Sequence, residues 1–308
     1  MFFLLRFTLY FLLVIIFAMP GEGSYFFEPF TESFGRRLKV EKFYYQGKTK
    51  YQFVQCFYNE FLGKVLFLDE KIQSAQIDEY IYHESLVHPA LVTHPSPKSI
   101  LVIGGGDGGA LKEILRYPIE HACLVEIDQQ VIDVSKEHFP WLLPSLEDER
   151  TELIIADGIE FIDKTDKKFD IVFIDSSNPT GPSVSLHEKD FYKNLKRCLN
   201  LEGIVVLQAG SPFYHLESLK KKDAFLKKLF KNVCFYTSPV PTYPGGSWCF
   251  VFLSDEVQPL KIKRDPSRGL KYFNLDIHQA AFSLPNFLMD LGYIDVINSS
   301  VFLLCGAY

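Results

Sequence analysis

Hydrophobic and polar positions alternate in short runs from about residue 38 to residue 76. The runs "LKVEKFYYQG", "YQFVQCFYN" and "GKVLFLDEKIQS" are rich in β-branched and aromatic residues and are broken at Gly47, Asn59 and Gly63. This pattern predicts a small antiparallel β domain over residues 25–77. In the next segment, "DEYIYHESLVHPALV", apolar residues recur every three or four positions, and this spacing predicts a helix over residues 78–92.

Beyond residue 98, apolar runs of strand length alternate with helical segments. The runs are "SILVIGG", "HACLVEID", "TELIIADG", "FDIVFIDSS" and "GIVVLQAG". Helices are predicted over residues 110–116, 129–138, 159–165, 189–199 and 216–230. Apolar strands separated by helices indicate a parallel sheet with helices on both faces. We therefore predict an α/β fold, a Rossmann-like parallel sheet preceded by the small antiparallel β domain. The segments "NVCFYTS" and "WCFVFLS" are expected to extend the sheet at one edge.

These patterns divide the chain into four parts: a hydrophobic N-terminal extension (1–24), the β domain (25–77), the Rossmann-like domain (78–295) and a C-terminal tail (296–308). In the extension, 13 residues from Phe7 to Met19 carry no charge, fewer than the roughly 20 that a membrane span needs. Three interpretations stay open: a signal peptide, an uncleaved extension or membrane anchor, and residues upstream of a true start at Met19. We expect a cytoplasmic protein.

The composition narrows the range of partners. Of the 308 residues, 47% are hydrophobic and 23% are charged, which allows a large buried core. The net charge is −6 and no long basic block is present, so we expect no nucleic-acid partner. None of the six cysteines lies in a C-x-x-C pair or at metal-ligand spacing from a histidine. The cysteine spacing therefore predicts no metal site. We also expect no prosthetic group.

Acidic residues follow four of the five predicted parallel strands. They are Asp107, Glu126, Asp157 and Asp175. Ligands of open α/β sheets bind beyond the carboxyl ends of the strands. A single acid at such a position is an ordinary turn or helix cap, but four along one edge predict a shared binding site.

The turn after the first parallel strand, "GGGDGG", combines glycines with one acid. Gly104, Gly106 and Gly109 match the G-x-G-x-x-G pattern, a weak signal for nucleotide binding. Glu126 at the next strand end suits ribose hydroxyls, and Asp157 suits an adenine amine. Asp107, however, would repel the pyrophosphate that a dinucleotide places at such a helix N-terminus. An adenosyl sulfonium with an amine tail would be attracted instead, so the turn predicts a cationic, adenosine-containing donor.

Together these residues resemble the spermidine synthases, polyamine aminopropyltransferases that use decarboxylated S-adenosylmethionine. The similar stretches are "GGGDGG", "EID", "ADG", "DSSNPTGP", "LDEKIQSAQIDEYIYHE", "PTYPGG" and "YFNLDIHQAAFSLP", in unbroken order from about Tyr25 to Leu291. The resemblance implies a methyltransferase-type sheet and transfer of an aminopropyl group to putrescine or another small amine. The expected products are spermidine and 5′-methylthioadenosine. It also implies a homodimer, with a tetramer as the alternative.

The resemblance further implies roles for individual residues. Asp175 would accept a proton, with the hydroxyl of Tyr82 nearby. Donor-binding residues would be Gln52, Gly104, Gly106, Asp107, Glu126, Asp157, Gly158 and Pro182. Amine-binding residues would be Gln73, Tyr82, His83, Asp107, Asp175, Asn178 and Tyr243. His278 is expected to pack the C-terminal segment and to take no part in chemistry.

Two positions depart from the family pattern. Asn178 stands in "DSSNP" where members usually have a second aspartate, and Gly210 stands in "QAGSPF" where some members have an acid. An amide oxygen accepts a hydrogen bond but adds no charge. Losing a charge-assisted hydrogen bond costs about 1–2 kcal/mol, or about tenfold in affinity. A different acceptor amine, a diamine N-methyltransferase and an inactive nucleoside-binding paralogue therefore stay open as alternatives.

Overall fold

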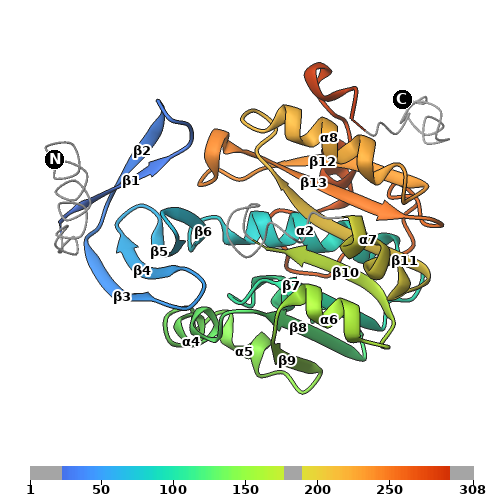
Figure 1. Cartoon of the computed structure of the whole chain (residues 1–308), viewed down its shortest axis with the longest axis horizontal. Coiled ribbons are helices and arrows are strands. Elements are labelled where there is room, and N and C mark those ends of the chain that lie inside the picture. The colour runs from blue at the N-terminus through green and yellow to red at the C-terminus, as the bar shows by residue number, and fades with distance from the viewer. Residues whose placement is uncertain (1–22, 177–188, 292–308) are drawn as a thin grey trace, which may run out of the picture. The chain divides into compact units, whose positions relative to one another are not determined.

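The structure, a computed structural model, describes residues 23–176 and 189–291 (Figure 1). The chain forms two compact units. The first comprises the chain up to Lys48 together with Phe53–Ile77, and the second comprises Thr49–Gln52 and the chain from Asp78 onward. The four-part division made from the sequence stays a prediction.

The first unit consists of antiparallel strands. A two-stranded sheet pairs β1 (Tyr25–Pro29) with β2 (Gly35–Lys39). A four-stranded sheet runs in the order β3 (Lys42–Lys48), β4 (Phe53–Asn59), β5 (Gly63–Leu68) and β6 (Lys71–Ala75). Asp69 and Glu70 form the turn between β5 and β6 with positive φ angles of 44° and 64°, as tight hairpin turns require. The predicted antiparallel β region is therefore confirmed.

The second unit is built on a seven-stranded sheet. Its strands are β7 (Ser99–Gly104), β8 (His121–Glu126), β9 (Thr151–Ile155), β10 (Phe169–Asp175), β11 (Leu199–Gly210), β12 (Asn232–Pro239) and β13 (Ser247–Ser254), in the order β12-β13-β11-β10-β7-β8-β9. Strands β7 to β11 are parallel to one another, whereas β13 runs antiparallel to both β11 and β12. The parallel sheet and its extension at one edge are thus as predicted.

Helices connect these strands. They are α2 (Glu79–Thr93), α3 (Gly109–Ile114), α4 (Gln129–His138), α5 (Leu143–Leu146), α6 (Gly158–Lys164), α7 (Lys189–Arg197), α8 (Leu216–Leu226) and α9 (Leu275–Ala281), with 3-10 turns η2 (Pro244–Gly246) and η3 (Asn286–Leu288). The helices predicted over residues 189–199 and 216–230 were too long. Helix α7 ends early because Leu199 already pairs with Phe169 as the first residue of β11. Helices α5 and α9 were not predicted.

The two faces of the sheet are covered by different helices, as Figure 1 shows. Alternate residues of a strand point to opposite faces. Val102 and Phe173 belong to one core, with residues of α2 and α3. Their neighbours Ile103 and Val172 belong to the other core, with residues of α6, α7 and α8. The prediction of helices on both faces is confirmed. In the described part of the chain, no helix has both the length and the apolar character needed to cross a membrane.

Candidate active site

The order of the strands places the four predicted acids along one edge of the sheet. Strands β10, β7, β8 and β9 are neighbours and parallel. Asp175 ends β10 and Glu126 ends β8, while Asp107 and Asp157 follow the ends of β7 and β9. In the strand order, β8 and β9 lie on one side of β7, and β10 lies on the other side. The position at which the strand order reverses in this way is where open α/β sheets usually bind ligands.

The glycines after β7 leave space for side chains from other elements. A Cβ atom on Gly106 would lie 2.9 Å from Cγ of Glu126, and one on Gly105 would lie 2.9 Å from Oδ2 of Asp175. A Cβ atom on Gly109 would overlap the imidazole ring of His83. In addition, Gly105 has a φ of 68°, which favours glycine. The turn thus allows acidic and imidazole groups to approach the backbone closely.

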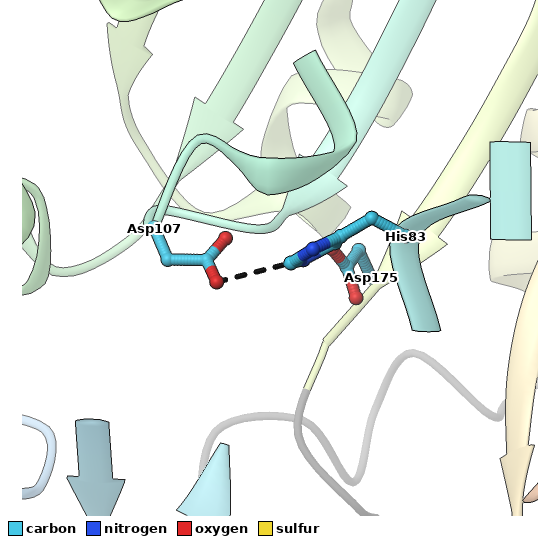
Figure 2. Close-up of side chains that lie close together, drawn as sticks. All are labelled: His83, Asp107 and Asp175. Atoms are coloured by element: carbon cyan, nitrogen blue, oxygen red, sulfur yellow. Dashed lines mark ion pairs between the residues drawn. The ribbon is translucent and has the colours of Figure 1, made fainter. Parts of the chain in front are cut away.

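Asp107 lies at the centre of this turn and is 7% exposed. Its Oδ1 accepts a hydrogen bond from the backbone N–H of Gly109 at 3.0 Å. Its Oδ2 lies 3.5 Å from Nε2 of His83, the ion pair drawn in Figure 2. The carboxylate of Asp175 is beside them, and one ligand atom from each of these three side chains lies within 4.8 Å of the other two. Two carboxylates and an imidazole at this spacing suit a cationic group such as an ammonium.

Asp175 is held by Tyr82 of helix α2. The Tyr82 hydroxyl donates a hydrogen bond of 2.6 Å to Oδ1 of Asp175. Burial raises the pKa of Asp175 to about 6, and the nearby Asp107 adds to this rise, while His83 and Tyr82 oppose it. Burial and the Asp175 carboxylate also raise the pKa of Tyr82 well above its usual value. Tyr82 therefore acts as a hydrogen-bond donor, and Asp175 has a pKa suited to proton transfer near neutral pH.

Tyr243 lies next to this cluster. Its ring centroid is 5.3 Å from that of Tyr82 and 4.6 Å from that of Trp248. The preceding residue, Thr242, donates from its backbone N–H and its hydroxyl to the two carboxylate oxygens of Asp78, each at 2.8 Å. The residue just before helix α2 therefore holds the loop that carries Tyr243.

Glu126 lies at the end of β8 on the other side of the glycine turn. Its two oxygens accept hydrogen bonds from the backbone N–H groups of Gly106 at 3.2 Å and Asp128 at 3.0 Å. Burial raises the pKa of Glu126 to about 7, although these backbone donors lower it. A hydroxyl donor from a ligand would stabilise the charged form of this carboxylate.

Gln52 reaches the same region through Asp128. Oδ2 of Asp128 accepts hydrogen bonds from Nε2 of Gln52 at 3.0 Å and from the Thr49 hydroxyl at 2.8 Å. Oδ1 of Asp128 accepts from the backbone N–H of Gln130 and thereby caps helix α4. Sequence reasoning missed Asp128, although it is the last residue of the quoted "EID" motif.

Asp157 and Gly158 form the start of helix α6, after β9. Oδ1 of Asp157 accepts a hydrogen bond of 2.8 Å from the backbone N–H of Ile159 and caps the helix. A side chain on Gly158 would collide with Ile103. The structure thus shows a capping role for Asp157, and its role toward an adenine stays a prediction.

The roles of three further predicted residues stay predictions. Gln73 lies in β6 of the first unit, where its Nε2 donates to the Lys71 carbonyl at 3.4 Å. Asn178 and Pro182 lie outside the described residues. His278, expected to be structural, is fully buried and has Nε2 2.6 Å from the Pro259 carbonyl oxygen.

Two acids of helix α2 were also missed. Glu79 accepts a hydrogen bond from His83, one turn further along the helix, and pairs with Lys112 of α3. Glu84 accepts three backbone N–H groups from residues 271–273 at 2.7–2.9 Å. Spacing alone suggested a helix with one buried face, but all of α2 except Tyr80 and Ile81 is buried. The Glu79–His83 spacing of four was the available signal.

Residues 79–264 match the family described as "Spermine/spermidine synthase domain". Residues 24–76 match the one described as "Spermidine synthase tetramerisation domain". A polyamine aminopropyltransferase of Caldicellulosiruptor saccharolyticus is 40% identical over 276 residues, covering 89% of this chain and 99% of that protein. The polyamine aminopropyltransferase of Bacillus subtilis is 38% identical over 264 residues, covering 85% and 96%.

Solved structures agree with the sequence comparison. A crystal structure of spermidine synthase in complex with the transition state analogue AdoDATO has a TM-score of 0.84 at 34% identity, covering 89% of this chain and 97% of that one. Spermidine synthase from Thermotoga maritima has a TM-score of 0.83 at 34% identity, covering 89% and 96%. The chain therefore belongs to the spermine/spermidine synthase family of polyamine aminopropyltransferases.

Proposed function

We propose that this protein transfers the aminopropyl group of decarboxylated S-adenosylmethionine to putrescine, producing spermidine and 5′-methylthioadenosine. The observation that carries this proposal is the cluster of Asp107, His83 and Asp175 beside the glycine turn. It places carboxylates where a dinucleotide-binding protein accepts pyrophosphate, and it therefore favours a cationic donor. The names of the relatives support the same class of reaction.

The donor would bind across the ends of β7, β8 and β9. Glu126, whose raised pKa reflects burial, would accept hydrogen bonds from the ribose hydroxyls, and Gln52 would be oriented for the same task by Asp128. The adenine would lie by Asp157 and Gly158. Asp107 would bind the ammonium of the aminopropyl group. Pro182 would line the nucleoside pocket, as the family resemblance implies.

The reaction needs a deprotonated amine more than it needs leaving-group activation. Sulfur leaves a sulfonium as a neutral thioether, whereas a diamine at neutral pH is protonated. Asp175 would accept one proton from the attacking ammonium while Tyr82 holds the carboxylate in place. The amine lone pair then forms the C–N bond, and the electrons of the C–S bond return to sulfur. Such a base contributes about 10²–10⁴-fold to the rate, and in-line placement of the two substrates contributes the larger share.

The acceptor would occupy the side of the cluster that carries Tyr82 and Tyr243. Gln73 and Asn178 are further candidates from the resemblance. Gly210, which adopts a φ of 93° at an irregularity in the pairing of β11, contributes no side chain there. A different acceptor, such as agmatine or a longer polyamine, is therefore the second candidate function. Asp107 argues against an N-methyltransferase, because the donor of that reaction keeps a carboxylate.

We also propose an oligomeric, cytoplasmic enzyme. The match of residues 24–76 to a tetramerisation domain supports assembly through the β region, as a homodimer or a tetramer. The proposed substrates are metabolites of the cytosol, which supports that location.

Methylthioadenosine release tests the proposal. The protein is incubated with decarboxylated S-adenosylmethionine and, in separate reactions, putrescine, cadaverine, agmatine or spermidine. We expect the highest kcat/KM with putrescine and no turnover with S-adenosylmethionine itself. Preference for another amine would select the second candidate, and methyl transfer from S-adenosylmethionine would contradict the proposal.

A further inference from the structure

A line of charged groups runs from helix α3 through helix α2 into the amine site. Nζ of Lys112 lies 3.0 Å from Oε1 of Glu79, and Oε2 of Glu79 lies 2.8 Å from Nδ1 of His83. Nε2 of His83 then faces Oδ2 of Asp107 at 3.5 Å. The side chains of Glu79 and His83 are 5% and 3% exposed. The mechanism above uses Asp107 but leaves Glu79 and Lys112 without a task.

The imidazole of His83 is fixed in orientation. Its ring lies against the backbone at Gly109, where a Cβ atom would overlap the ring. The ring also contacts that of Tyr82 in a T-shaped arrangement, with 5.3 Å between centroids. A carboxylate accepts hydrogen bonds, so Nδ1 must carry its hydrogen toward Glu79. The protonation of Nε2 is the only remaining variable: it donates to Asp107 when the ring is charged, and it offers a lone pair when the ring is neutral.

Before any ligand binds, the surroundings favour the charged ring. Burial alone would lower the pKa of His83, but Asp107 and Glu79 outweigh burial and raise that pKa well above its usual value. Asp175 faces the ring from β10. On the side of α3, Lys112 balances the second oxygen of Glu79. Burial would raise the pKa of Glu79, but His83 and Lys112 lower it. Glu79 is therefore a carboxylate at neutral pH.

We propose that Glu79 is a positioning residue that keeps one hydrogen of His83 on Nδ1. The proton that His83 releases, when the ammonium of the aminopropyl group enters beside Asp107, is therefore the one on Nε2. This inference rests on the donor proposed above. The ammonium replaces the imidazolium as the counter-ion of Asp107 and Asp175, because two cations at this spacing repel each other in a buried site. The N–H bond at Nε2 breaks, the proton leaves to solvent, and the Nε2 lone pair accepts a hydrogen bond from the ammonium.

Two thioether ligands of the nucleoside site, neither of which carries a sulfonium charge, isolate this exchange. One is 5′-methylthioadenosine, and the other is the 5′-(3-aminopropylthio) analogue of adenosine, which adds only the ammonium arm. Calorimetric titrations in phosphate and in Tris at pH 7 measure the protons released by each ligand. We expect the aminopropyl ligand to release about 0.5–1 proton more than methylthioadenosine, because the two ligands differ only at the group that displaces the proton. Any change at Glu126 is common to both ligands and cancels.

Two variants assign the proton. In His83→Gln, the side chain no longer titrates, so the difference between the two ligands should disappear. In Glu79→Gln, the amide oxygen still accepts the Nδ1 hydrogen, but the ring loses the charge that raises its pKa, so less of it is protonated before the ligand binds. The difference should then shrink at least twofold, while methylthioadenosine binds as before. Glu160→Gln is the control, because Glu160 pairs with Lys164 on the exposed surface of α6; it should behave like the native protein.

The inference is overturned if the native protein releases equal numbers of protons with both ligands. It is also overturned if His83→Gln keeps the difference, or if Glu79→Gln weakens both ligands alike. The comparison in the native protein needs no variant, so it decides the matter even if a variant does not fold. Failure of the proposed function is a separate result: neither ligand binds, or no methylthioadenosine forms from the donor and any amine.

Discussion

Gly109, the first residue of α3, offers a direct test of the architecture of the site. In Gly109→Ala, the new Cβ atom would lie within 3.0 Å of Cε1, Nε2 and Nδ1 of His83. Ordinary contacts begin near 3.4 Å, so the ring would have to retreat by at least about 1 Å. The backbone of Gly109 has no positive φ, and strain in the main chain would therefore not contribute to the result.

The expected change in the free energy of unfolding follows from the interactions that the His83 ring loses. Its retreat breaks the 2.8 Å hydrogen bond to Glu79 and the 3.5 Å pair with Asp107. Hydrogen bonds to charged groups contribute about 1.5–3 kcal/mol each, and alanine gains about 0.5–1 kcal/mol over glycine in a helix. We expect a net loss of about 2–5 kcal/mol in the free energy of unfolding. A binding group misplaced by about 1 Å should lower kcat/KM about 10²-fold.

Urea denaturation and methylthioadenosine release measure the two effects. Gly269→Ala serves as the matched control, because Gly269 has a φ of 76° and no atom within 4 Å of an added Cβ. That variant should lose about 1–2 kcal/mol through left-handed backbone strain and keep its kcat/KM. If Gly109→Ala keeps native stability and native kcat/KM, the tight contact between the turn and His83 does not matter and our reasoning fails.

Three further predictions concern the chemistry and the donor. Asp175→Asn should lower kcat about 10²–10⁴-fold, while the affinity for methylthioadenosine, measured by calorimetry, should not change. Near-native turnover would exclude a base at this position. Because burial raises the pKa of Asp175 to about 6, the base form is lost as pH falls through that value. The value of kcat/KM should then fall about tenfold per pH unit on the acid side of the profile. Tyr82→Phe should move this acid limb to higher pH, because the Tyr82 hydrogen bond lowers the pKa of Asp175. A shift of the acid limb to lower pH would contradict this prediction. Asp128→Ala removes the cap of α4 and the partner of Gln52. It should cost about 1 kcal/mol in a urea titration and weaken methylthioadenosine binding, and unchanged binding would show that Gln52 needs no such support.

Charge at the strand ends was the most informative feature of the sequence. Asp107 in a glycine turn indicated a cationic ligand before any neighbour was known. The structure supplies the environment: Asp107 lies 3.5 Å from His83, and both are within 4.8 Å of Asp175. The glycines have a second role that no motif conveys. They leave room for Glu126, Asp175 and the ring of His83 to approach the turn.

Helix α2 shows where periodicity is insufficient. Apolar spacing predicted a helix, and the roles of Tyr82 and His83 came only from the family resemblance. In the fold, its acids are buried together with their partners, Glu79 with Lys112 and Glu84 with backbone N–H groups of residues 271–273. Those partners come from elements far along the chain, and a local pattern does not record them.

Local patterns determined the types of element in this protein, the covering of the sheet on both faces and the acids at four strand ends. They did so because the apolar periods of strands and helices, and the residues that end them, are properties of short segments. Only the tertiary structure decided that β10 lies beside β7, which brings Asp175 next to Asp107 from far along the chain. The lateral order of parallel strands and the pairing of buried charges depend on contacts between distant segments, whose free energy no short stretch of sequence contains.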